Sequence, residues 1–151
     1  MAPAPTSPEF CTCLAIRQAA RHVSQYYDQY LAPSGLRATQ FSILSKLKAL
    51  GPLTINKLAM MLVMDRTTLG RNIVPLQREA LIAVAQGAVD RRSKELHLTD
   101  LGLERLNVAW PYWEKAQSGF DAAFGSRQDS ELRALMRAVT TTELVVASPE
   151  S

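Results

Sequence analysis

The feature that most constrains the fold is a change of hydrophobic period between residues 80 and 99. Apolar residues alternate at positions 82–85 and again at 95–98, which is typical of strands with one buried face. A polar, glycine-containing segment, residues 86–93, separates the two runs. This part of the chain therefore predicts a hairpin with a long basic tip, placed between segments whose spacing is helical.

Four helices are expected before the hairpin, at about residues 9–31, 38–50, 55–63 and 66–80, because apolar residues recur there three and four apart. Ser7, followed by a proline and an acid, predicts the start of the first helix. Thr54 and Asp65 can cap the third and the fourth. The short connection at 63–65 makes the third and fourth helices a candidate helix-turn-helix.

Two further helices are expected after the hairpin. Residues 99–124 carry a seam of apolar and aromatic side chains that resembles a coiled coil. This helix should therefore pack along another helix, which could belong to a partner chain. Pro111 is expected to kink it. Ser126 and Asp129 have capping-box-like spacing and would begin the last helix. The positions of that helix expected to face inward are Leu132, Leu135, Met136 and Val139.

Composition places the chain among globular domains. Its 151 residues, 47% of them hydrophobic, are enough for a single domain, residues 1–151, without covalent staples. No apolar run approaches the length of about 18 residues that suggests a membrane span, and no secretory signal is visible. Two cysteines are too few for a disulfide framework, which fits a reducing, cytoplasmic location.

The positive charge is concentrated in the middle of the chain. Residues 37–98 contain ten Lys or Arg residues and four Asp or Glu residues, whereas the whole chain carries a formal net charge of only +3. The flanks are therefore net acidic. A basic centre of this kind favours a polyanionic partner such as nucleic acid.

Several short strings resemble the MarR family of bacterial transcription regulators. The most specific is DRRSK at residues 90–94, followed by LHLTDLG at 96–102; the others are GL at 35–36, QF at 40–41 and DRTTL at 65–69. The resemblance runs from about residue 10 to about residue 140. It implies a fold that is mainly α with a small β-wing, a winged helix-turn-helix flanked by N- and C-terminal dimerisation helices.

The resemblance also implies how the chain is organised and what it binds. Residues 1–8 would be a disordered lead, residues 9–33 and 100–147 the dimerisation helices, and residues 37–99 the winged-helix DNA-binding region. A homodimer of such chains would bind a pseudo-palindromic operator in double-stranded DNA.

The residues expected to contact DNA lie on the fourth helix, on the wing and on the third helix. Arginine and asparagine suit bidentate bonds to guanine and adenine in the major groove, and Arg92 suits a narrow A·T-rich minor groove. Asp90 is expected to brace Arg92 or the wing backbone. Arg37 stands where the family often has a helix-capping Ser or Thr, which weakens that cap and offers a phosphate contact. The full candidate set is Lys57, Arg66, Thr67, Thr68, Arg71, Asn72, Arg91, Arg92 and Lys94.

These residues also have interpretations that do not involve DNA. Arg66 and Arg71 could be solvated helix charges, and the wing could be a plain surface hairpin or a grip for an acidic protein partner. The clustering of Arg91, Arg92 and Lys94 at one tip favours DNA.

The trigger that the resemblance most commonly implies is a small phenolic or anionic effector. Its candidate pocket residues are Arg17, Tyr27, Tyr30, Trp110 and Trp113. Aromatic residues at helical spacing can equally be core.

The alternative trigger is oxidation. Some MarR relatives sense organic hydroperoxides with a cysteine near the start of the first helix, held by tyrosines. Cys13 occupies that position, with Cys11 beside it, and Tyr27 matches one tyrosine, while Ala38 stands at the place of the other. The two cysteines could instead be small buried residues of the dimer interface.

Catalytic and cofactor motifs are lacking in the sequence. It contains no glycine-rich phosphate loop, no G-x-S-x-G and no H-E-x-x-H, so neither an enzyme nor a cofactor is expected. Two thiolates are too few for a zinc site, and neither His22 nor His97 is close in sequence, so no metal is expected. The prediction is a DNA-binding transcriptional regulator acting as a repressor. An activator stays open, because that distinction depends on where the operator lies relative to the promoter.

Overall fold

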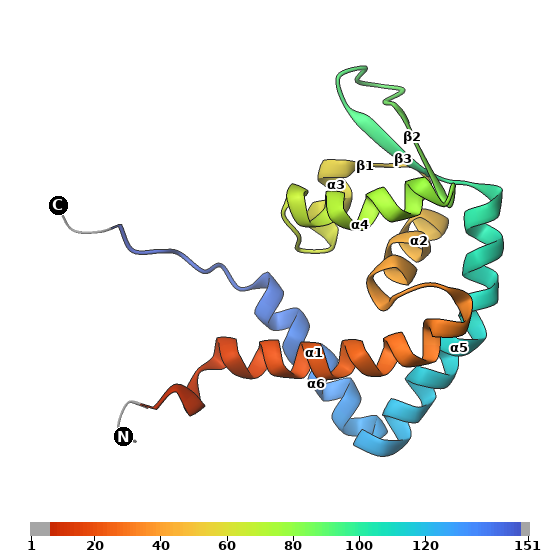
Figure 1. The fold of residues 1–151 in the computed structure, drawn as a ribbon. Helices are drawn as coiled ribbons and strands as arrows, with labels where there is room; N and C mark the ends of the chain where they lie inside the picture. Colours follow the sequence, from red (N-terminus) through yellow and green to blue (C-terminus); the bar gives the residue numbers. More distant parts are fainter. Residues whose placement is uncertain (1–6, 149–151) are drawn as a thin grey trace. The chain divides into compact units, whose positions relative to one another are not determined.

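The computed structural model describes residues 7–148 (Figure 1). The described residues form two compact units, one ending at Ala116 and one beginning at Gln117. Short 3-10 turns at Pro8–Phe10 and Ala32–Ser34 flank the first helix. The helices are α1 (Thr12–Leu31), α2 (Ala38–Leu50), α3 (Ile55–Met61), α4 (Arg66–Arg78), α5 (Asp100–Phe124) and α6 (Ser126–Thr141), and the strands are β1 (Leu53–Thr54), β2 (Ile82–Gln86) and β3 (Lys94–Leu98).

The hairpin is present, with one strand more than predicted. β2 and β3 pair antiparallel, with Ile82 opposite Leu98. β1 pairs with the other edge of β3, Leu53 opposite Leu96, so the strand order is β1-β3-β2. Figure 1 shows the hairpin extending beyond α3 and α4, which lie beside its base. The mainly helical fold with a small β-wing is confirmed.

A leucine core holds the helix-turn-helix against this sheet. Fully buried leucines come from α2, α3, α4, β3 and α5, and burying each contributes about 1.5–3 kcal/mol relative to leaving it exposed. Because α3 and α4 bury their apolar faces in the same core, their mutual angle is fixed and the opposite face of α4 is left to solvent. Five of these residues, each 0% exposed, are Leu44, Leu58, Leu69, Leu96 and Leu106.

The two capping residues predicted for the helix-turn-helix are confirmed. Oγ1 of Thr54 accepts the N–H of Lys57 at 3.1 Å at the start of α3. Oδ1 of Asp65 accepts the N–H of Thr68 at 2.7 Å at the start of α4. These bonds satisfy donors that a helix start leaves without a partner.

The string LTDLG locks the base of the wing to the end of α4. The hydroxyl of Thr99 donates to the carbonyl of Ala80 at 2.6 Å and accepts the N–H of Gly102 at 2.9 Å. A Cβ on Gly102 would collide with the carbonyl oxygen of Leu81, so only glycine allows α5 to approach this closely. The position of the wing relative to α4 is therefore set by backbone contacts.

The start of α2 is capped in a way that the sequence did not reveal. A carboxylate oxygen of Asp28, on α1, accepts the N–H of Ala38 at 2.7 Å. The side chain of Gln40 accepts the N–H of Arg37 at 3.0 Å. An arginine has no acceptor atom, so Asp28 replaces the missing Ser or Thr cap from a neighbouring helix.

The predicted start of the first helix was wrong. Ser7 caps only a 3-10 turn, Pro8–Phe10, and α1 begins at Thr12 with Cys11 as its N-cap. Cys11 has an extended backbone, φ −71° and ψ 112°, which interrupts the helical path between the turn and α1. Residues 1–6 of the expected disordered lead lie outside the described residues.

The predicted capping box of the last helix was also wrong. Gly125 is the N-cap of α6, without a side-chain bond, and Ser126 is its first helical residue. Asp129 is instead buried, accepting a bond from Gln117 at 3.3 Å and pairing with Arg133 at 3.2 Å. Its charge is satisfied by side chains rather than by the helix start.

The apolar face of α6 is exposed rather than inward. Leu135 is 62%, Met136 38% and Val139 42% exposed, while Leu132 is half-buried. Periodicity identified these positions as apolar, but the described part of the chain leaves most of that face uncovered. α5 is continuous from Asp100 to Phe124 with Pro111 inside it, and the expected kink stays a prediction. Within residues 7–148, no helix is long and apolar enough to cross a membrane.

Candidate nucleic-acid interface

The start of α4 is a tightly bonded turn. Both carboxylate oxygens of Asp65 are bonded to Thr68, one to its N–H at 2.7 Å and the other to its hydroxyl at 2.8 Å. These bonds stabilise the ionised carboxylate and lower the pKa of Asp65 below its usual range. The turn that precedes it contains Val63 in the left-handed region, at φ +53°.

One exposed stripe of α4 faces away from the core. Thr67, Arg71, Val74 and Arg78 are all exposed and lie four, three and four residues apart, which places them on one side of the helix. Sequence reasoning considered only the first turns of the helix and missed Val74 and Arg78. The signal that could have found them is the same helical spacing, read from the polar side.

Two of the predicted helix residues are held in local bonds. The amide nitrogen of Asn72 donates to the carbonyl of Thr68 at 2.9 Å, and the Asn72 side chain is half-buried. The Thr68 hydroxyl is bonded to Asp65. Their DNA contacts stay predictions, and Asn72 would have to leave its local bond to reach a base.

The fold brings predicted residues of α4 and the wing together. Arg66, Arg92 and Lys94 line one cavity of about 260 Å³, together with Thr54–Asn56 and Ser93. Lys57 is exposed on α3, one residue beyond this lining. Cations from α4 and from the wing, which are well separated in sequence, therefore share one hollow, the wing-base hollow.

The wing tip is organised by Asp90. Its Oδ1 accepts the backbone N–H of Arg92 at 2.9 Å, and its carbonyl accepts the N–H and the hydroxyl of Ser93. The carbonyl of Arg91 accepts a bond from the amide of Gln86 at 2.9 Å. The loop is thus held through its backbone, and both Arg91 and Arg92 are exposed.

The basic side chains of this surface are not neutralised by neighbours. Within residues 7–148, ion pairs form at Arg105, Arg127, Arg133 and His97, and none involves a cation of α4 or of the wing tip. The cations left without a carboxylate are Arg66, Arg71, Arg78, Arg91, Arg92 and Lys94.

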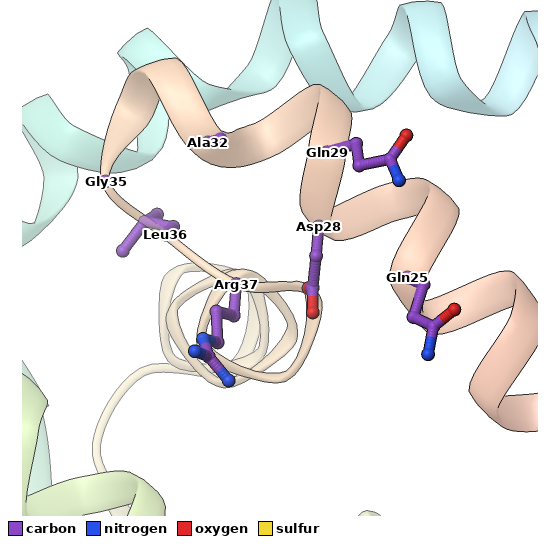
Figure 2. Close-up of a pocket in the computed structure, with 7 residues that line it drawn as sticks. All are labelled: Gln25, Asp28, Gln29, Ala32, Gly35, Leu36 and Arg37. Carbon is purple, nitrogen blue, oxygen red and sulfur yellow. The ribbon is translucent and has the colours of Figure 1, made fainter.

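Another hollow lies between α1 and the α1–α2 connection (Figure 2). It has a volume of about 560 Å³. Figure 2 shows Gln25, Asp28 and Gln29 projecting from α1, with Arg37 across from them. Its remaining lining residues are Ala32, Gly35 and Leu36.

None of the predicted effector residues lines that hollow. Trp110 and Trp113 pack on Phe41, with ring centroids 5.8 and 5.6 Å away. Tyr27 and Tyr30 instead gather around Tyr26, at 5.7 and 5.0 Å.

Tyr26 is the residue of this group that sequence reasoning missed. Its hydroxyl donates to the carbonyl of Ala116 at 3.1 Å. Burial and the proximity of Tyr30 raise the pKa of Tyr26.

Arg17 is exposed on α1 and lines none of the hollows described above. The effector role of the whole set stays a prediction.

The two cysteines are exposed in the single chain. Their burial in a dimer interface stays a prediction, as does their role as a sensor. Sγ of Cys11 accepts the N–H of Leu14 at 3.5 Å, at the beginning of α1. Cys13 lies in the first turn of the same helix. Among the described residues, no three His, Cys, Asp or Glu side chains gather as a metal site.

Comparisons with known proteins identify the group to which this architecture belongs. The sequence model of the MarR family matches residues 36–94. The chain is 37% identical to the transcriptional regulator MosR of M. tuberculosis, solved in complex with DNA, with a TM-score of 0.76 over 89% of this chain and 99% of MosR.

Two further relatives agree. The uncharacterized HTH-type transcriptional regulator YwoH of Bacillus subtilis is 32% identical over 96 residues, which cover 62% of this chain and 69% of YwoH. BpsR of Bordetella bronchiseptica shares the fold at 21% identity, with a TM-score of 0.80 over 93% of this chain and 100% of BpsR. MosR and YwoH are both described as transcriptional regulators. The identity and coverage of these matches show that the chain belongs to the MarR family of transcriptional regulators.

Proposed function

We propose that this chain is a repressor that binds a pseudo-palindromic operator in double-stranded DNA as a homodimer and leaves it when a small effector binds. One observation carries the proposal: cations of α4 and of the wing line one hollow, and within residues 7–148 none of them forms an ion pair. Such a surface suits a partner that brings its own negative charge at regular spacing.

In this proposal α4 enters the major groove. Arg66 and Arg71 donate to guanine or to phosphates, and Thr67 with Val74 offers methyl groups for contact with thymine. Asn72 reads adenine after releasing the carbonyl of Thr68.

The wing and α3 supply the remaining contacts. Arg92 enters the adjacent minor groove, while Lys57, Arg91 and Lys94 bind phosphates. Asp90 touches no DNA but keeps the wing tip in shape through the N–H of Arg92.

The exposed apolar face of α6 supports the homodimer. Leu135, Met136 and Val139 present contiguous apolar surface that water disfavours and that a second copy would bury. Two DNA-binding units related by twofold symmetry would then contact half-sites about one helical turn apart, which is why the operator should be a pseudo-palindrome.

The proposed trigger is a small phenolic or anionic effector bound near the terminal helices. In the related BpsR, DNA binding is regulated by 6-hydroxynicotinic acid, a ligand of that chemical class. An effector that prefers one spacing of the two α4 helices shifts the dimer away from the DNA-binding state. The candidate contacts are Arg17, Tyr27, Tyr30, Trp110 and Trp113.

A thiol-based oxidant sensor is the second candidate, favoured by the exposure of both cysteines. An oxidant can reach Cys11 and Cys13 directly, and oxidation of Cys11 would alter the N-cap of α1. If Cys13 is the sensor, an organic hydroperoxide releases wild-type protein from DNA and fails to release Cys13→Ser, and intact mass identifies the oxidised species. Release of both, or of neither, removes Cys13 from the mechanism.

The test of the main proposal is fluorescence anisotropy with a duplex that this protein selects from a random-sequence library. We expect binding that weakens steeply between about 50 and 200 mM salt. Arg92→Ala should weaken it further without changing the melting temperature. If no duplex raises the anisotropy at physiological salt, the proposal is rejected in favour of a winged helix that docks on an acidic protein.

A further inference from the structure

A second basic hollow lies on the other flank of α4, where α1, α2 and α4 meet. Its volume is about 340 Å³. Its charged lining residues are Asp28, Arg37 and Arg71. The remaining lining residues are Ser24 on α1, Ala38, Thr39 and Gln40 on α2, and Asn72 and Pro75 on α4.

The charges in this hollow are unequal. Arg37 and Arg71 are both exposed, and within residues 7–148 neither guanidinium forms an ion pair. The carboxylate of Asp28 is already bonded to the N–H of Ala38 at 2.7 Å. Two cations without an ion pair thus share the hollow with one carboxylate, which is bonded to the start of α2. The hollow keeps a net positive charge that one added anion would balance.

The side of α4 on which this hollow lies determines which DNA phosphate could reach it. Arg66, in the wing-base hollow, and Pro75, in this one, are nine residues apart, which is about 180° around a helix. The two basic hollows therefore flank α4 on opposite sides. Arg71 belongs both to the exposed stripe and to this hollow, so the hollow adjoins the surface proposed to meet DNA.

A helix in the major groove has one phosphate backbone on each side. The wing-base hollow, with Arg66, Arg92 and Lys94, lies toward one strand. We infer that Arg37 and Arg71 clamp a backbone phosphate of the other strand. This inference rests on the proposed function and adds a second, strand-specific anchor to it.

The replacement of the usual cap fits this role. Because Asp28 caps α2 from α1, position 37 is free of the capping task that a Ser or Thr would perform there. An arginine at that position provides a planar fork of donors that matches two phosphate oxygens. Its backbone N–H is bonded to Gln40, so the base of the side chain is fixed.

The experiment compares Arg37→Gln, Arg37→Lys and Arg127→Gln on the selected duplex. Arg127→Gln is the matched control, since it removes the same charge from an arginine that is 91% exposed and paired with Glu131. We expect Arg37→Gln to reduce the slope of log K against log salt by about 0.9 per lost phosphate, or about 1.8 for a dimer on two half-sites. Specific and shuffled duplexes should weaken alike, Arg37→Lys should restore most of the slope, and Arg127→Gln should match the wild type.

A scan of single methylphosphonates along the duplex then locates the phosphate. The wild type should lose affinity at one position on the strand away from the wing, and Arg37→Gln should be insensitive at that position only. An unchanged slope together with equal sensitivity to the scan would overturn the clamp while leaving the proposed function intact. If wild-type protein binds no duplex, both fail.

The last experiment tests binding of free inorganic phosphate. If it binds the DNA-free protein through Arg37, as judged by calorimetry, while the DNA salt slope of Arg37→Gln equals that of the wild type, the hollow takes a small anion and the clamp is rejected. Equal melting curves for the four proteins would show that the comparison concerns binding and not folding.

Discussion

Two helical glycines provide a test of the packing at the base of the wing, because the structure predicts opposite signs for their replacement by alanine. Gly70 lies within α4 and Gly102 within α5. Alanine in a helix interior is usually more stable than glycine by about 0.5–1 kcal/mol. Helix propensity alone therefore predicts the same gain at both positions.

The surroundings of the two glycines differ. At Gly70 nothing lies within 4 Å of an added Cβ, so the full gain of about 0.5–1 kcal/mol is expected. At Gly102 the Cβ would collide with the carbonyl of Leu81 and lie 2.8 Å from Cδ1 of Leu98. That carbonyl accepts the N–H of Thr99 at 3.2 Å, so it cannot move away freely. Overpacking costs about 1–3 kcal/mol and loss of the bond about 1 kcal/mol.

After the helical gain is subtracted, Gly102→Ala should lose about 1–3 kcal/mol. Thermal unfolding followed by circular dichroism, at one fixed protein concentration, converts each kcal/mol to about 2–4 °C for a chain of this size. Gly70→Ala should melt above the wild type and Gly102→Ala below it. Equal stabilisation by both would refute the close approach of α5 to the end of α4.

Three further predictions concern the starts of α2 and α4 and the turn that precedes α4. Asp28→Ala should lower the free energy of unfolding by about 1 kcal/mol in urea, because the N–H of Ala38 loses its acceptor, and Asp28→Asn should lose less. Bonds from Thr68 lower the pKa of Asp65, so its ionised form stabilises the fold above the ordinary carboxyl pKa, and this contribution disappears as the pH falls through the lowered value. The stability difference between wild type and Asp65→Asn should therefore shrink in acid; a constant difference from about pH 7 to about pH 2 would contradict it. Val63→Asn should stabilise the chain by about 1 kcal/mol, because asparagine tolerates the left-handed conformation at φ +53° better than valine, and a lowered melting temperature would refute that account.

Local patterns predicted those elements whose cause is local. The two-residue alternation predicted β2 and β3, and the Ser/Thr/Asp rule for helix starts predicted the caps of α3 and α4 at Thr54 and Asp65. The wing residues Arg92 and Lys94 were predicted to share a task with Arg66, and the structure brings the three to one hollow.

Contacts between elements were beyond those patterns. The cap supplied by Asp28 joins residues ten positions apart on two helices, and β1 has only two residues, too few to show a period. The apolar face of α6 was predicted to point inward and is exposed, because periodicity finds an apolar face but does not say what covers it. The capping box at Ser126 failed because Asp129 is bonded to Gln117 and Arg133 instead of to the helix start.

The unpaired cations of α4 and the wing are best understood from the small energies of surface ion pairs. An exposed pair stabilises a fold by only about 0–1 kcal/mol, so leaving Arg71 or Arg92 without a carboxylate costs the folded chain little. In the proposed complex, each cation of this surface that meets a DNA phosphate displaces a condensed counterion, and that gain grows with every contact. Under that proposal, the arrangement of these cations serves the partner rather than the stability of the fold. For this reason the charge count of residues 37–98 indicated a polyanionic partner, while the position of Arg37 beside Arg71 became visible only in three dimensions.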